Sequence, residues 1–151
     1  MNPFEIKKVK YADLPQAAAI HSVSWQASHQ AICSEAFLSI HTPEHQKKYL
    51  EQAMENGAGF YMLSVKGKPV GIVSVHKSLI ENLYVLPEEQ NRGYGTRLLR
   101  HAIEKCDQAP TLWILEKNEG ARRLYERTGF RMTGRMHTLS DTIAECEMRL
   151  G

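Results

Sequence analysis

Residues 90–96 bring two glycines, a cation and a hydroxyl together, and this combination is typical of a site for phosphate. The segment reads Gln90, Asn91, Arg92, Gly93, Tyr94, Gly95, Thr96. It lies between an apolar run at 80–86 and a stretch of helical periodicity at 96–106. The first N–H groups of a helix have no intrahelical partner and the helix dipole is positive there, so phosphate oxygens are favoured. Because Gly93 and Gly95 lack a Cβ, a pyrophosphate can approach the backbone. The expected ligand is therefore a phosphorylated cofactor.

Other glycine loops fit these residues less well. In a Rossmann loop the third glycine would fall at Leu98, and no acidic residue closes a following strand at the expected distance. A Walker loop requires a Lys-Ser or Lys-Thr pair after the glycines, and none follows. A plain strand-to-helix turn, in which the glycines serve only tightness, stays open from this segment alone.

The composition limits the kind of protein that must position this loop. A chain of 151 residues fits one domain, expected over residues 1–151, and 42% hydrophobic with 24% charged residues is ordinary for a globular protein. A net charge of +2 is too small for a general nucleic-acid binder. No apolar stretch has the length of a signal peptide or a membrane span. Three cysteines, Cys33, Cys106 and Cys146, suit a reducing cytoplasm, each as a small buried hydrophobic residue. We expect a cytoplasmic protein with neither nucleic acid nor membrane as partner.

The hydrophobic periodicity predicts an alternation of strands and helices. Asp13 caps the first helix, Thr42 and Pro43 begin the second, Asn118 caps the last, and Gly129 ends it. An irregular stretch through Cys33 and Phe37 separates the first two helices, and residues 66–69 form a hairpin turn. The predicted helices cover 14–29, 43–56, 96–106 and the segment from 118 to 129; the predicted strands cover 4–10, 60–65, 70–76, 79–86, 111–115, 130–136 and 143–150. The result is a mixed α/β domain with a central sheet.

Two motifs in this order resemble the GNAT superfamily of N-acetyltransferases. The first is the segment from Gln90 to Gly95, which matches that family's pyrophosphate loop, Q/R-x-x-G-x-G/A, and follows a strand carrying Leu83, Tyr84 and Val85. The second is the strand at 113–116 followed by the residues Asn118, Ala121, Leu124, Tyr125, Gly129 and Phe130. The resemblance covers about half the chain, from the strand at 79 to Met136. It implies a mostly antiparallel sheet of about six to seven strands flanked by about four helices, with a splayed pair of central strands.

The resemblance implies acetyl-CoA as acetyl donor. Its pantetheine arm would lie between the splayed strands, paired with the main chain of Leu83, Tyr84 and Val85. A backbone N–H at a bulge there can polarise the thioester carbonyl. Residues 90–96 would bind the pyrophosphate, and Asn118 would contact the pantetheine arm. A helix cap alone is the other explanation of Asn118, and both roles can hold together.

The resemblance also implies roles in proton transfer. Tyr125 lies seven residues after Asn118, so the two share a helix face, and in the family a tyrosine here protonates the departing thiolate. A phenol with a pKa of about 10 is protonated at neutral pH and can do so. Packing beside Leu124 is the alternative. Glu81 is the first candidate for the base that deprotonates the amine and Glu116 the second; a solvated carboxylate is the alternative for each.

The first helix and neighbouring strands line the acceptor side in this family, which suggests His21, Trp25, His29 and Tyr61 as substrate-side residues, with core packing as the alternative. His41 and His45 lack the motif of a zinc site, and no metal is assigned. No thiol motif surrounds Cys33, so direct transfer in a ternary complex is expected.

The expected function is acetylation of a primary amine: a small amine, a polyamine or a peptide amine. The alternatives are a non-catalytic acyl-CoA-binding regulatory module and a dinucleotide-binding protein. Many members of the family form dimers, so a homodimer is the expected kind of assembly if the chain associates.

Overall fold

The computed structural model describes residues 3–30, 34–141 and 143–151, and their centre is a seven-stranded sheet. The order across the sheet is β1-β2-β3-β4-β5-β7-β6. All neighbouring strands run antiparallel except β4 and β5, which are parallel. The strands are β1 (Phe4–Lys8), β2 (Gly59–Val65), β3 (Lys68–His76), β4 (Leu79–Val85), β5 (Thr111–Leu115), β6 (Phe130–Thr138) and β7 (Ala144–Leu150). The predicted α/β class and mostly antiparallel sheet are confirmed.

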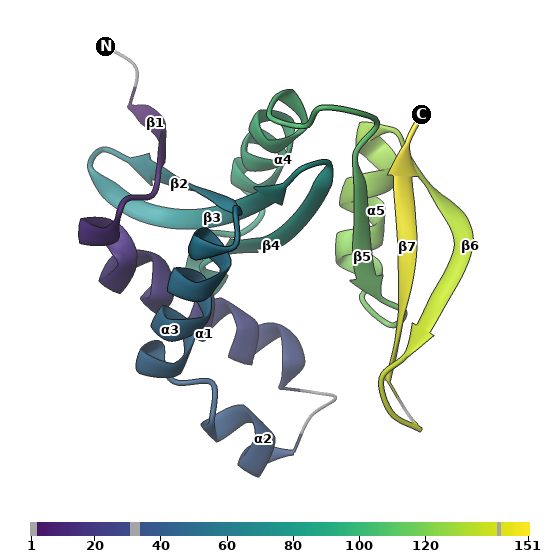
Figure 1. The fold of residues 1–151 in the computed structure, drawn as a ribbon, viewed down its shortest axis with the longest axis horizontal. Helices are drawn as coiled ribbons and strands as arrows, with labels where there is room; N and C mark the ends of the chain where they lie inside the picture. The colour runs from purple at the N-terminus through teal and green to yellow at the C-terminus, as the bar shows by residue number, and fades with distance from the viewer. Residues whose placement is uncertain (1–2, 31–33, 142) are drawn as a thin grey trace.

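Helices cover both faces of the sheet. They are α1 (Leu14–His29), α2 (Glu35–Ser39), α3 (Pro43–Glu55), α4 (Tyr94–Glu104) and α5 (Glu119–Thr128). In Figure 1, α1 and α3 lie on one side of β2–β4, α4 lies on the other, and α5 lies behind β5 and β7. One apolar cluster joins α4 and α5 to the sheet, through residues such as Leu98 and Tyr125. A second cluster joins α1 and α3 to the other face, through Leu14, Ile20 and Leu50.

Most of the local signals for the ends of helices hold in the structure. The Thr42 side chain accepts a hydrogen bond from the His45 N–H at 3.1 Å, and Asn118 accepts one from Ala121 at the same distance. Gly129 ends α5 with φ of 111°, a left-handed conformation that glycine adopts at little cost. The caps at Thr42 and Asn118 therefore locate α3 and α5. The prediction that Asp13 caps α1 needs correction: Asp13 occupies the N-cap position, but its carboxylate accepts from the Lys10 N–H at 2.9 Å and makes no side-chain cap.

Two predictions about connecting segments need correction. The stretch through Cys33 and Phe37 was expected to be irregular, but α2 forms at its end; five residues make too little periodicity to recognise. Cys33 itself lies outside the described residues. The hairpin turn is only Lys66 and Gly67, both with positive φ, and Lys68 already belongs to β3.

Helix α4 begins at Tyr94, two residues before the predicted start at Thr96. Gly93 is its N-cap, with φ of 85°. The Tyr94 side chain is buried and packs edge-to-face on Phe4, with ring centroids 5.9 Å apart. Because this packing extends the helix backwards, Gly95 and Thr96 lie in its first turn and not in the loop before it.

Strands β4 and β5 pair at one end only and then separate. The paired residues are Leu79 with Thr111 and Ile80 with Leu112. Beyond them the two strands diverge (Figure 1), so the rest of β4 has no β5 partner. The predicted splayed pair of central strands is confirmed.

A β-bulge interrupts β4 at this point of divergence. Glu81 pairs with Ser74 and Tyr84 pairs with Ile72, so Asn82 and Leu83 together face a single residue of β3. Asn82 has a φ of 55°, the left-handed conformation that asparagine tolerates better than most residues. A bulge of this kind leaves a backbone group outside the ladder and re-aims the neighbouring side chains.

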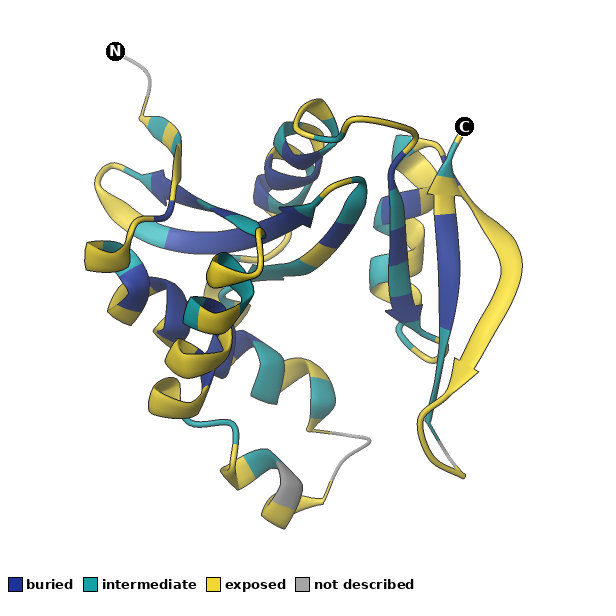
Figure 2. Ribbon diagram, viewed as in Figure 1, coloured by how far each residue is buried: buried dark blue, intermediate teal, exposed yellow. Residues whose placement is uncertain are grey.

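Burial is concentrated in the middle of the sheet. Figure 2 shows β3 largely buried and the edge strand β6 exposed along almost its whole length. Cys146 is buried in β7 and Cys106 is half-buried, as small apolar residues often are. Within the described parts of the chain, no helix combines the length and the apolar character needed to cross a bilayer.

Candidate active site

The N-terminus of α4 has the geometry of an anion cradle. Gly93 caps the helix without a side chain, and the Arg97 N–H bonds to the Gly93 carbonyl at 3.2 Å. The N–H groups before Arg97 therefore precede the first intrahelical bond. Asn91, with φ of 64°, and Arg92 are exposed beside them, and Gln90 donates to the Val85 carbonyl at 3.1 Å. These residues fit a pyrophosphate, with backbone donors at the centre and Arg92 at the edge.

The two loop glycines have different reasons to be glycine. A Cβ at Gly93 would meet nothing within 4 Å, but its φ of 85° disfavours any other side chain. At Gly95 the conformation is ordinary, and an added Cβ would lie 3.4 Å from Leu124 of α5. Gly93 thus serves the turn, and Gly95 the close approach of α4 to α5.

The unpaired part of β4 forms one wall of the gap. Leu83 and Val85 pack against the apolar cluster of α4, whereas Tyr84 packs against that of α1 and α3. The side chains are thus used in packing on both faces, and the main chain of 83–85 lies along the edge that β5 has left. An extended molecule can pair with this edge as an additional strand would.

Tyr125 lies within α5, and Asn118 is the residue that caps this helix. Tyr125 is buried, edge-to-face with Phe130, and burial raises the pKa of its phenol to about 12. Burial also raises the pKa of Tyr84, and the nearby phenols of Tyr125 and Tyr49 add to that rise. The cap formed by Asn118 uses only its side-chain oxygen, which leaves the amide nitrogen as a donor.

The bulge leaves both Glu81 and Asn82 on the side of α1 and α3. Ile80 and Leu83, three residues apart, both belong to the cluster on the α4 face. In a regular strand, residues on the same face are two positions apart, but Ile80 and Leu83 are three apart. Glu81 and Asn82 therefore both lie on the opposite face, which α1 and α3 cover. Glu81 is exposed by surface area, but partial desolvation of its carboxyl raises its pKa; His76 opposes this rise and Glu145 adds to it. Burial raises the pKa of Tyr49 on α3; the hydrogen bond from Asn82 opposes this rise, and Glu81 adds to it.

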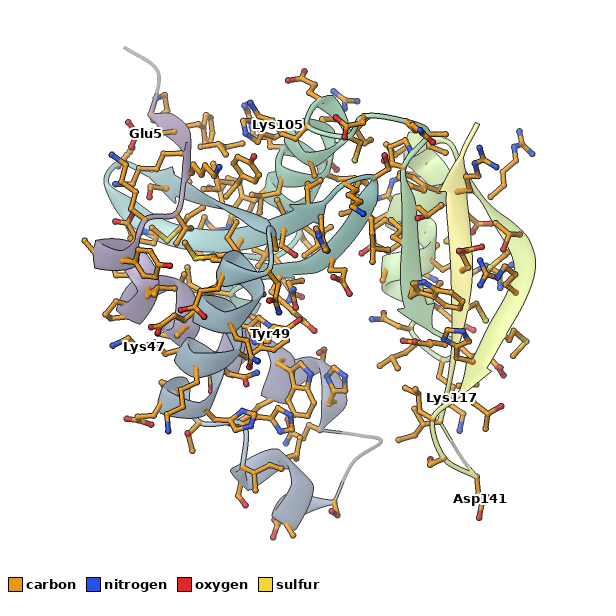
Figure 3. All side chains as sticks on the ribbon, viewed as in Figure 1. Glu5, Lys47, Tyr49, Lys105, Lys117 and Asp141 are labelled. Carbon is orange, nitrogen blue, oxygen red and sulfur yellow. The ribbon has the colours of Figure 1, made fainter. Side chains whose placement is uncertain are left out.

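Glu116 lies elsewhere, at the end of β5. It is exposed and lines a cavity of about 280 Å³. The other walls come from the β6–β7 hairpin, with Met136 and Asp141 among them. Figure 3 labels Lys117 and Asp141 at this end of the molecule, and Tyr49 on α3 across from them.

A second cavity, of about 170 Å³, lies between α1, α3 and β4. Its described lining combines aromatic and imidazole rings with two side-chain amides and has no carboxylate, lysine or arginine. The residues are His21, Trp25, His41, His45, Gln46, Tyr49, Asn82 and Tyr84. Trp25 is stacked between two imidazoles, with centroids 4.0 Å from His29 and 3.7 Å from His41. Among the described residues, no group of three or more His, Cys, Asp or Glu is arranged to hold a metal ion.

A chain of hydrogen bonds crosses this cavity wall. Gln46 Nε2 lies 2.8 Å from His21 Nδ1, and His21 Nε2 lies 3.0 Å from Asn82 Oδ1. Asn82 Nδ2 donates to Ser74 Oγ at 3.0 Å and to the Tyr49 hydroxyl at 3.3 Å. Burial lowers the pKa of His21 to about 4; the bond to Asn82 opposes this, and the nearby His41 and His29 reinforce it. His21 is therefore neutral at physiological pH.

The structure brings most of the expected acceptor-side residues together; Tyr61 and the candidate base Glu116 lie apart from them. His21 and Trp25 line the second cavity, and His29 stacks on the far side of Trp25. Tyr61 lies on the opposite face of the sheet, edge-to-face with His101 of α4 at 5.0 Å. Helix α1 is on the other face, so Tyr61 is separated from the cavity by the sheet.

Sequence reasoning missed several residues of this cavity, above all Asn82 and Tyr49. An asparagine inside an otherwise apolar strand was the available signal, because asparagine is the residue other than glycine that most readily takes positive φ. Tyr49 and Gln46 lie on a helix whose distance from β4 in the sequence hid their proximity.

Comparison with known proteins agrees with this arrangement. The profile of the acetyltransferase (GNAT) family matches residues 18–130. The probable N-acetyltransferase Rv2775 of Mycobacterium tuberculosis is 30% identical over 144 residues, covering 88% of this chain and 83% of that protein.

Solved structures share the fold at lower identity. The acetyltransferase yncA of Salmonella typhimurium, solved with acetyl-CoA, superposes with a TM-score of 0.72 at 20% identity, covering 99% of this chain and 94% of the other. The paia N-acetyltransferase of Thermoplasma acidophilum, solved with coenzyme A, gives 0.71 at 19% identity, covering 95% and 97%. With the match over most of its length, the chain belongs to the acetyltransferase (GNAT) family and is an acetyl-CoA-dependent acyltransferase.

Proposed function

We propose that this protein transfers an acetyl group from acetyl-CoA to a primary amine by direct attack in a ternary complex, with residues 1–151 acting as one domain. The observation that carries the proposal is the gap between β4 and β5 beyond Ile80. The glycine-capped end of α4 follows β4, the bulge at Asn82 lies on one wall, and α5 carries Tyr125 and Asn118. These are the parts that an acyl-CoA and an attacking amine need.

Binding of the donor would use mainly the backbone. The N–H groups of residues 91–96, with the charge of Arg92, would hold the pyrophosphate. Gln90 would keep the loop in place through its hydrogen bond to the Val85 carbonyl. The main chain of Leu83, Tyr84 and Val85 would pair with the pantetheine arm, and the amide nitrogen of Asn118 would donate to it. Tyr94 and Thr96 contribute through the first turn of α4. The acetyl group would then lie at the bulge, where a backbone N–H can polarise its carbonyl.

Proton transfer would use Tyr125 and Glu81. The raised pKa keeps the Tyr125 phenol protonated, so it can donate to the thiolate that leaves. Glu81 lies on the α1 and α3 side of β4 with a raised pKa, which makes its carboxylate a better base than a fully solvated one. Glu116, exposed on the wall of the other cavity, remains the second candidate base.

The amine would approach from the side of α1 and α3. There the second cavity offers His21, Trp25 and Tyr49 beside Asn82, and His29 supports Trp25 from behind. We do not include Tyr61, which lies across the sheet. Free thiols at Cys106 and Cys146 support the cytoplasm as the location.

A coupled assay tests the proposal. Purified protein is mixed with acetyl-CoA and one amine at a time: a small amine, a polyamine, an aromatic amine and a peptide with a free N-terminus and lysine. We expect CoA release with at least one class and its loss in Tyr125→Phe. Bound acetyl-CoA without CoA release for any class would contradict acetyl transfer and favour a regulatory acyl-CoA-binding module.

A further inference from the structure

The hydrogen bonds around Asn82 form a chain whose direction is fixed by one carbonyl group. The Ser74 hydroxyl lies 3.0 Å from the main-chain oxygen of Glu81, which can only accept, so Ser74 donates. Ser74 Oγ must then accept from Asn82 Nδ2, which leaves Asn82 Oδ1 to accept from His21 Nε2–H. Because His21 is neutral, its Nδ1 accepts from Gln46 Nε2.

The hydrogen bonds at the two ends of this series also have defined directions. Gln46 Oε1 accepts from His45 Nδ1 at 2.8 Å, and the second Asn82 proton goes to the Tyr49 hydroxyl at 3.3 Å. These bonds link the surface of α3, through α1, to the bulge in β4. Paired polar groups in a buried network restrict the arrangement of its members.

These hydrogen bonds hold Asn82, the left-handed residue of the bulge, from two sides. Asn82 is bound to α1 and α3 through His21 and Tyr49, and to β3 through Ser74. Ser74 also binds the carbonyl of the residue just before Asn82. Side-chain bonds on both sides of a single residue with φ of 55° restrict how the next peptide group can be oriented.

Both ring nitrogens of His21 are occupied by these bonds, which leaves neither for a substrate proton. Its ring is 3% exposed and lies edge-to-face on Tyr84, with centroids 4.9 Å apart. The titratable groups around it are Tyr49 on α3, Tyr84 on β4, and His29 and His41. The histidine is therefore placed to orient Asn82 and not to act as the base.

We infer that His21, supported by Gln46, is a positioning residue that acts through Asn82 to fix the β4 bulge, and thereby aims the bulge N–H at the acetyl carbonyl of the bound donor. The inference rests on the proposed function, because the proposed acetyl site is at this bulge. It assigns His21 a role within the protein where sequence reasoning had placed it only beside the substrate.

Three variants test the inference with the full-length protein. His21→Phe keeps the size of the ring and removes both hydrogen bonds, whereas His21→Gln keeps a donor for Asn82. Ser22→Ala is the matched control: it removes a partly buried hydrogen bond of α1, from the Ser22 hydroxyl to the His41 carbonyl at 2.6 Å, and Ser22 has no hydrogen bond to Asn82. Each protein is saturated with acetyl-CoA labelled with ¹³C at the carbonyl, and the infrared C=O stretch is recorded.

We expect the stretch to move to lower frequency on binding to the wild type, to Ser22→Ala and to His21→Gln, and to move much less in His21→Phe. The dissociation constant for CoA, which lacks the acetyl group, should stay within about twofold in all four, because the pyrophosphate contacts are unchanged. With an active amine, kcat of His21→Phe should fall roughly tenfold to a hundredfold. This loss is smaller than the hundredfold to thousandfold, roughly, that follows when an oxyanion donor is removed, because the bulge N–H is misaligned but still present. An unchanged carbonyl shift in His21→Phe would overturn the inference.

Two further measurements keep the test decisive if His21→Phe does not fold or acetyl-CoA does not bind. In the free protein, the amide resonances of Asn82 and Leu83 should move in Asn82→Gly, whose backbone tolerates positive φ, and not in Ser22→Ala. If His21 acts through Asn82, His21→Ala should move the Leu83 amide resonance in the wild-type background and cause no further change when it is added to Asn82→Gly; additive changes would overturn the inference. Absence of acetyl-CoA binding in the wild type would refute the proposed function instead.

Discussion

Lowering the pH from about 8 to about 5 should destabilise this protein through His21, and His21→Gln should lose most of that sensitivity. The folded state holds the pKa of His21 at about 4, below its ordinary value of 6.5, because the ring is buried. The unfolded chain therefore takes up a proton between these values that the folded protein refuses. A state that binds more protons is favoured as pH falls, so the free energy of unfolding decreases.

The size of the effect follows from the two pKa values. A pKa difference of one is worth about 1.4 kcal/mol, so His21 should cost about 2 kcal/mol by pH 5 and roughly 3 kcal/mol by pH 4. Solvent screens this effect little, because His21 is 3% exposed. Urea unfolding slopes are about 1–3 kcal/mol per molar, so the urea midpoint should fall by about 1 M at pH 5.

The assay is urea unfolding followed by far-ultraviolet circular dichroism, for wild type and His21→Gln at both pH values. Burial also lowers the pKa values of His29 and His101, but both proteins keep these residues, so the difference between them reports His21. The variant should start less stable at pH 8, because its hydrogen bonds fit less well, and should then lose about 2 kcal/mol less than the wild type by pH 5. Equal losses in the two proteins would refute the assignment of His21 as a buried neutral histidine.

Further changes test the other proposed roles. Tyr125→Phe should lower kcat on the order of a hundredfold with unchanged acetyl-CoA affinity by calorimetry, and a large loss of affinity would make Tyr125 a packing residue. Gly93→Glu should abolish acetyl-CoA binding in a protein that still folds by circular dichroism, because the residue needs φ of 85° and a carboxylate would face the pyrophosphate; normal binding would reject the loop assignment. Asn118→Ala should lose about 1 kcal/mol of stability with its cap, whereas Asn118→Asp should keep the cap, and both should bind acetyl-CoA more weakly in titrations. Glu81→Gln should remove the fall in kcat/KM on the acidic side of the pH profile, which the raised carboxyl pKa produces; an unchanged acidic limb would point to Glu116 or to water.

Much of the fold follows from local signals in the sequence. The apolar stripe after Asp13 predicts α1 to the residue, and the caps at Thr42 and Asn118 locate α3 and α5. The alternating strands likewise predict the sheet. These features depend on residues close together in the chain, where periodicity and capping chemistry act directly.

The parts that were missed depend on distant contacts. The start of α4 is set by Tyr94 packing on Phe4, ninety residues earlier in the chain. The face on which Tyr61 lies follows from which helices cover which side of β2, and sequence alternation alone leaves that choice open. The network at Asn82 joins α1, α3, β3 and β4, so no local pattern could reveal that His21 binds it.

Calorimetric titration with acetyl-CoA, with NADH as the control ligand, tests the central claim most directly. Saturable binding of acetyl-CoA and no binding of NADH is the predicted result, because the gap beside β4 and the cradle at Gly93 together suit a pantetheine arm and its pyrophosphate. No binding of acetyl-CoA by a folded sample would contradict the account, since the cradle and the gap would then serve another ligand or none.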